Sequence, residues 1–169
     1  MNAVGPKLLS GLLREHGAAL VLYARQWCQT PEDVVQEAFL QLVQQSEPLG
    51  NTVAWLYRVV RNGAISAARS AHRRRRHESA ASHQGEPWFD SGHDDRIDAD
   101  AVTEALRQLP QAEAETIVAR LWGGLSFDAI AELTGDSRTT VFRRYQAGLE
   151  VLRERFGVTC HRQENRMKT

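Results

Sequence analysis

The sequence has few of the features that mark secreted, membrane or metal-binding proteins. It contains only two cysteines, Cys28 and Cys160, and neither has a second cysteine at the spacing of a metal or redox site. Structural disulfides are therefore not expected. No apolar run approaches the roughly 18 residues of a membrane-spanning helix, and no basic stretch at the N-terminus precedes an uninterrupted apolar one. We expect a soluble, cytoplasmic protein without membrane insertion.

The motifs of common enzyme classes are also absent. There is no glycine-rich phosphate loop, no Gly-x-Ser-x-Gly elbow and no His-Glu-x-x-His motif. Most of the six histidines lie in an arginine block, a linker or the C-terminal tail, and are interpreted as solvated. Cys160 and His161 could bind a metal only with ligands from elsewhere. We expect no enzymatic activity, no cofactor and no metal site.

The net charge of zero hides an uneven distribution. Residues 1–77 carry ten Lys and Arg against five Asp and Glu, residues 78–100 carry one against seven, and residues 101–169 carry ten against nine. The acidic segment is rich in Ser, Gly, Asp and Pro and has no apolar periodicity. The pattern predicts two modules, residues 1–77 and 101–169, that are joined by a flexible acidic linker and meet a polyanion through selected faces.

Every periodic signal is helical, so the expected fold class is all-α with two small helical domains. Leucine spacing near the N-terminus outlines one or two short helices. Thr30 as N-cap and Pro31 as first helical residue predict the start of the next, and another is expected from near Thr52 into the arginine block at 73–76. The stripes expected to be buried are Val34, Val35, Ala38, Phe39, Leu42 and Val43, and then Trp55, Leu56, Val59, Val60 and Ala64.

The second module has the pattern of a helix-turn-helix. Two helices are expected between residues 100 and 122, separated by Pro110 and ended by two glycines. Ser126 can cap a short third helix, Gly135 permits a tight turn, and Ser137 can cap the last helix. This is the order in which a second helix enters the DNA major groove.

The first two turns of that last helix are the candidate contact with duplex DNA. They carry Arg138, Thr139, Thr140, Arg143 and Arg144. Such side chains reach base edges, while arginines and the helix N-terminus hold phosphates. A solvated amphipathic helix is the alternative, but the preceding cap and glycine turn favour DNA contact.

Two further faces are candidates for binding. The helix after residue 52 displays arginines near an aromatic side chain, which fits single-stranded nucleic acid; its members are Trp55, Arg58, Arg61, Asn62, Arg69 and Arg73. Trp55 could equally be a core anchor, and a basic run alone could simply be solvated. One face of the helix after residue 30 could be a solvated acidic surface or a protein interface; its members are Asp33, Gln36, Glu37 and Leu40.

Three motifs in this order resemble bacterial extracytoplasmic-function (ECF) sigma factors, a family of RNA polymerase sigma factors. They are DVVQEAF at 33–39, AWLYRVVRN at 54–62 and LSFDAIAELTGDSRTTVFRR at 125–144. The resemblance implies that the first module binds the clamp helices of the polymerase β′ subunit and melts the minus-ten promoter element. It implies that the second module binds the minus-thirty-five element. Three positions depart from the family pattern: Ser66, Thr134 and Asp136.

The resemblance also assigns roles to the three faces. The face of Asp33, Gln36, Glu37 and Leu40 would bind core polymerase, the face from Trp55 to Arg73 would hold melted DNA with the loop at 46–52, and the arginine-bearing last helix would read duplex promoter DNA. A separate anti-sigma factor is the implied regulator. The alternative function is a stand-alone helix-turn-helix regulator that does not bind core polymerase. A nuclease is disfavoured, because no metal-binding carboxylate cluster accompanies the basic face.

Overall fold

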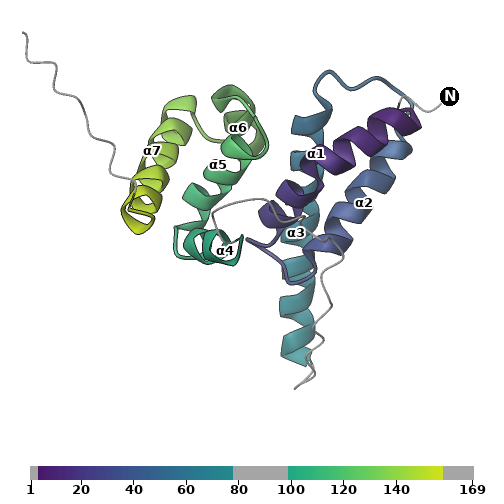
Figure 1. Ribbon diagram of the computed structural model, residues 1–169. Helices are drawn as coiled ribbons and strands as arrows, with labels where there is room; N and C mark the ends of the chain where they lie inside the picture. Colours follow the sequence, from purple (N-terminus) through teal and green to yellow (C-terminus); the bar gives the residue numbers. More distant parts are fainter. Residues whose placement is uncertain (1–3, 78–98, 158–169) are drawn as a thin grey trace, which may run out of the picture.

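The computed structural model describes residues 4–77 and 99–157, and these residues contain seven helices and no strand (Figure 1). The predicted all-α class is confirmed. The first domain consists of α1 (Pro6–Ala24), α2 (Pro31–Val43) and α3 (Thr52–His77). The second consists of α4 (Ala99–Arg107), α5 (Gln111–Leu121), α6 (Phe127–Thr134) and α7 (Arg138–Arg155). Of the predicted linker, residues 78–98 lie outside the described residues.

In the first domain, two of the three helices begin at a proline. Pro6 and Pro31 stand at the beginnings of α1 and α2, where the missing backbone N–H is no loss. Thr30 occupies the N-cap position of α2, as predicted, although its side chain makes no capping hydrogen bond. The N-terminal leucines belong to one helix, and α3 runs without a break through the arginine block, as predicted.

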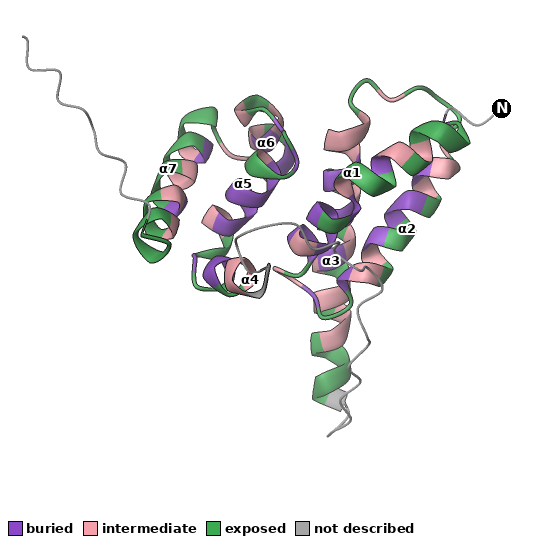
Figure 2. Cartoon of the chain, in the orientation of Figure 1, coloured by how far each residue is buried: buried purple, intermediate pink, exposed green. Residues whose placement is uncertain are grey.

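The inner faces of the three helices form the first part of the core (Figure 2). Leu20, Leu42, Leu56 and Val60 are fully buried there, and the last three belong to the stripes predicted to be buried. Four residues predicted to be buried are only half-buried, because they lie at the edges of their stripes; they are Val34, Val43, Trp55 and Val59.

The second domain has the predicted helix-turn-helix. The Ser126 hydroxyl accepts a hydrogen bond from the Ala129 backbone N–H (3.1 Å), and the Ser137 hydroxyl accepts one from that of Thr140 (3.2 Å). Between them, Gly135 adopts φ +77°, a left-handed conformation that ends α6 and is strained for other residues. These local interactions fix the angle at which α7 leaves the turn.

The two domains pack against each other, which the two-module prediction did not include. Buried apolar residues form one continuous cluster, from Leu20 and Leu56 in the first domain to Ile117 and Ile130 in the second. Helix α1 contacts α5, and α3 contacts α6 (Figure 1). Within the described residues, no helix is long and apolar enough to cross a membrane.

Candidate nucleic-acid interface

Helix α2 presents the four residues predicted to bind polymerase on one exposed face. Asp33, Gln36, Glu37 and Leu40 follow the spacing of successive helical turns, and all four are exposed. The Leu40 side chain is 51% exposed, although the opposite face of the helix is buried in the core. An apolar side chain among acids and amides is the composition of a protein-binding surface with an anchor.

Helix α3 presents a second exposed face, which is basic. Arg58, Asn62, Arg69 and Arg73 are exposed, and their spacing places them on one side of the helix. Trp55 lies at the start of the same side, is half-buried and packs against the core. The structure therefore supports the core-anchor interpretation of Trp55 and leaves part of its surface exposed.

Arg61 does not share this basic face, because it precedes Asn62 by one position and so points about 100° away from it. Its Nε donates a hydrogen bond to Oε1 of Glu115 on α5 (2.7 Å). The Tyr23 hydroxyl donates to the same oxygen (2.7 Å). Arg61 also lies 6.0 Å from the centre of the Trp27 ring. Of the predicted minus-ten residues, Arg61 is therefore the one engaged at the domain junction.

The surroundings of Tyr23 and Arg61 keep the proton on both groups. Burial and the neighbouring Glu115 carboxylate raise the pKa of Tyr23, so its hydroxyl remains a donor. Burial alone lowers the pKa of Arg61, but the hydrogen bond and the charge of Glu115 outweigh burial and raise it. The contact is thus a charge-assisted one between guanidinium and carboxylate.

Sequence reasoning missed Glu115. Its side chain is only 6% exposed, which is rare for a carboxylate. One signal was present: Glu115 lies one helical turn before the buried Val118 and Ala119, so it occupies a buried face of α5. A charged residue on such a face requires a partner, but the sequence does not identify which one.

Helix α7 presents the residues predicted to contact the minus-thirty-five element at its N-terminus. Arg138, Thr139 and Arg143 are exposed there. Thr140 is half-buried, and its hydroxyl lies 2.9 Å from that of Ser137. The structure therefore brings most of this set to one exposed helix end.

Arg138 Nε lies 3.7 Å from Oδ1 of Asp128 on α6, in an exposed ion pair. Arg144 forms a closer, half-buried ion pair with Asp136. Its Nη1 donates to Oδ2 of Asp136, and its Nη2 donates to Oδ1 (3.3 Å). The hydrogen bond from Arg144 lowers the pKa of Asp136. Asp136, one of the departures from the family pattern, thus ties the turn to the second turn of α7.

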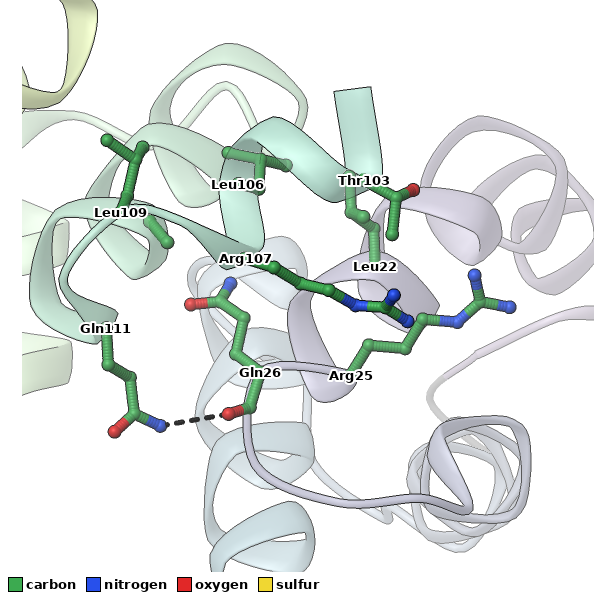
Figure 3. A pocket seen from close by; sticks show the side chains of 9 residues that line it. Leu22, Arg25, Gln26, Thr103, Leu106, Arg107, Leu109 and Gln111 are labelled. Carbon is green, nitrogen blue, oxygen red and sulfur yellow. Dashed lines mark hydrogen bonds between the residues drawn. The ribbon is translucent and has the colours of Figure 1, made fainter. Parts of the chain in front are cut away.

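A small cavity lies where the two domains meet (Figure 3). Leu22 and Arg25 line it from the first domain, and Leu106 and Arg107 line it from the second. Beside it, Gln111 Nε2 donates to the backbone oxygen of Gln26 (3.1 Å), so a hydrogen bond also crosses the junction here.

No group of three or more His, Cys, Asp or Glu residues within residues 4–77 and 99–157 could hold a metal ion. Cys28 is buried, and burial raises the pKa of its thiol. The pair Cys160 and His161, considered above as an incomplete metal site, lies outside the described residues.

Comparison with known proteins relates each domain to a different region of the Sigma-70 proteins. Residues 12–74 match the Sigma-70 region 2 family, and residues 99–152 match the Sigma-70 region 4 family. The chain is 32% identical over 166 aligned positions to the ECF RNA polymerase sigma factor SigL of Mycobacterium tuberculosis, covering 90% of this chain and 92% of that protein. It is 27% identical over 124 positions to the RNA polymerase sigma factor SigV of Bacillus subtilis, covering 72% of each.

Solved structures agree at the level of the fold. The sigma factor RpoE of Bartonella quintana, in complex with the anti-sigma factor NepR, has a TM-score of 0.71 and 22% identity, covering 92% of this chain and 100% of that one. CnrH, in complex with the cytosolic domain of CnrY, has a TM-score of 0.56 and 21% identity, covering 92% of each. Together with the match to SigL, these findings show that the chain belongs to the ECF RNA polymerase sigma factors.

Proposed function

We propose that the chain binds core RNA polymerase and directs it to promoters, where the first domain melts the minus-ten element and the second reads the minus-thirty-five element. The supporting observation is that one small domain exposes two chemically different faces, an acidic face with a leucine on α2 and an arginine face on α3. A stand-alone DNA-binding regulator would need only the helix-turn-helix.

The α2 face fits a protein partner better than it fits DNA. Asp33 and Glu37 would repel phosphates, whereas Leu40 offers exposed apolar area that a partner can bury. The partner we propose is the clamp-helix region of the polymerase β′ subunit. This places the protein in the cytoplasm, where the polymerase acts.

The α3 face fits single-stranded DNA. Arg58, Arg69 and Arg73 can neutralise phosphates, and the half-buried Trp55 retains an exposed part on the same side of the helix. Pulling a base out of the duplex costs a few kcal/mol, so melting needs a pocket that receives the base. We assign that role to this face together with the loop at 46–52.

The exposed end of α7 fits duplex DNA. Arg138 and Arg143 can contact base edges or phosphates in the major groove, and Thr139 can donate or accept a hydrogen bond. Two similar structures, RpoE and CnrH, contain a second protein, an anti-sigma factor in the first case. We propose that a separate anti-sigma partner also controls this chain.

The polymerase-binding face is tested by Glu37→Lys, which reverses one charge in the middle of the α2 face. We expect loss of binding to core polymerase in a pull-down, and loss of promoter-directed transcription in a reconstituted reaction. Glu132→Lys is the matched control, because Glu132 is also exposed but lies on α6. Wild-type protein that binds duplex DNA without binding core polymerase would instead support a stand-alone regulator.

A further inference from the structure

A large apolar side chain lies among the polar residues that α7 presents to solvent in its first two turns. Phe142 is 43% exposed, and its exposed neighbours on the helix are Arg138, Thr139 and Arg143. Helical spacing places Phe142 one turn after Arg138, at the border between the exposed face and the stripe that packs on the core. A single exposed apolar residue is ordinary on a protein surface. Its position among predicted DNA contacts gives Phe142 a more specific meaning.

Phe142 is held in place by an aromatic residue of α6. The ring centres of Phe142 and Phe127 are 5.3 Å apart, and the two rings lie at 89° to each other, in an edge-to-face contact that stabilises aromatic pairs. Phe127 in turn packs against the core, contacts the Tyr145 ring at 5.4 Å and has the guanidinium carbon of Arg120 4.7 Å from its ring centre. The exposed part of Phe142 is therefore presented by a fixed support.

The major groove of DNA offers one apolar group at its base edges. Thymine carries a methyl group at C5, whereas the edges of adenine, guanine and cytosine present hydrogen-bond donors and acceptors. Arg138 and Arg143 suit phosphates and guanine edges, but a guanidinium gains nothing from a methyl group. An aromatic side chain between them can bury its exposed area against that methyl group.

We infer that Phe142 recognises the methyl group of a thymine in the duplex that α7 binds. The inference rests on the proposed function and deepens it, because it assigns a base to the upstream promoter element. Thr139 is the competing candidate, since it is exposed on the same face and its side chain also carries a methyl group. Phe142 offers the larger apolar area, so it should account for most of the preference for thymine.

The experiment removes the methyl group from the DNA and leaves every hydrogen-bonding group in place. Full-length protein bound to core polymerase first enriches duplexes from a random-sequence promoter library. Each thymine in the enriched upstream block is then replaced in turn by deoxyuridine, which lacks only the methyl group. Competition in a gel-shift assay gives the affinity of the same complex for the thymine and deoxyuridine duplexes.

We expect wild-type protein to bind one of the deoxyuridine duplexes about fourfold more weakly than the thymine duplex, the effect of one methyl-sized group lost from an apolar contact. Phe142→Ala should bind both duplexes equally, and Phe142→Leu should keep part of the preference. Each variant is compared with itself on two duplexes. A smaller fraction of folded protein therefore lowers both apparent affinities and leaves their ratio unchanged.

Two control variants should keep the preference of the wild-type protein. Phe156→Ala is the matched control, because Phe156 is 36% exposed but lies after the last residue of α7. Thr139→Ser removes the methyl group of the competing candidate and keeps its hydroxyl. Phe142→Ala should also bind core polymerase as the wild-type protein does in a pull-down.

Several results would overturn the inference. Equal wild-type binding of the thymine and deoxyuridine duplexes at every position would show that no methyl group is recognised, as would an enriched upstream block without thymine. A preference that survives in Phe142→Ala, or is lost in Thr139→Ser, would assign the contact to another residue. Weaker polymerase binding by Phe142→Ala would assign Phe142 to a protein contact. Failure of the proposed function is distinguishable, because the wild-type complex would then enrich no common upstream sequence.

Discussion

Arg144 stabilises the fold through its ion pair with Asp136, and the same ion pair limits the contact with DNA that was predicted for Arg144. Both guanidinium Nη atoms donate to the Asp136 carboxylate, and the hydrogen bond from Arg144 lowers the pKa of Asp136 from its ordinary 3.8. A lowered carboxyl pKa adds stability above the ordinary value and loses it as the pH falls through the folded-state value. The ion pair should therefore stabilise the helix-turn-helix at neutral pH but not in acid.

The prediction at this scale concerns stability against pH. Between about pH 6 and about pH 3, wild-type protein should lose more unfolding free energy than Asp136→Asn, because only the wild-type carboxyl must be protonated out of its ion pair. Urea unfolding at a series of pH values measures this difference. Arg144→Ala should lack the same pH-dependent part of the unfolding free energy. The double variant Asp136→Asn with Arg144→Ala should show no further reduction of that part. Parallel pH profiles for wild type and Asp136→Asn would contradict the assignment.

Residue roles were predictable where they depend on local chemistry. The caps Ser126 and Ser137 and the left-handed Gly135 follow from their positions beside the helical stripes, and the structure has all three. Thr30 also takes its predicted N-cap position, but its side chain makes no capping hydrogen bond, which the residue type alone does not reveal. The ion pair of Asp136 with Arg144 was also missed, since the two residues meet only once the turn and α7 take up their relative angle.

At the scale of the element, the exposed end of α7 carries the prediction for promoter recognition. Arg143→Ala should weaken binding to a minus-thirty-five element by about 1–3 kcal/mol if Arg143 makes a bidentate guanine contact. Arg153→Ala is a matched control, since Arg153 is exposed on the last turn of the same helix. Footprinting of the upstream element and filter binding measure both variants. An Arg143→Ala footprint identical to wild type would remove this residue from the interface.

The elements themselves were largely predictable because helical periodicity is a local signal. The order of helices, the long α3 and the helix-turn-helix all appear as expected. The N-terminal helix was less well defined, since Gly11 and Gly17 interrupt its pattern of large apolar residues. In the structure both glycines lie within α1, and Gly17 is buried. The helix is held there by its contacts with α2 and α3, which no window of sequence contains.

At the scale of the whole molecule, the sequence predicted two modules and a linker but not their docking. The contacts responsible are far apart along the chain: Tyr23 and Glu115 are separated by 92 positions, and Arg61 and Glu115 by 54. Neither a charge count nor a periodicity shows such a pairing. The acidic and basic segments instead suggested independent modules, whereas the core is continuous across both.

The continuous core leads to a prediction about cooperativity. Since Leu20 on α1 and Ile117 on α5 belong to one buried cluster, the most protected amides of these two helices should exchange with the same opening free energy in native-state hydrogen exchange. In Glu115→Ala, which removes the acceptor of the hydrogen bonds from Tyr23 and Arg61 across the junction, the amides of α5 should exchange at a lower free energy than those of α1. Glu132→Gln should behave as wild type does. Two distinct opening free energies in the wild-type protein would mean that its domains already unfold independently, and that the shared apolar cluster does not couple them.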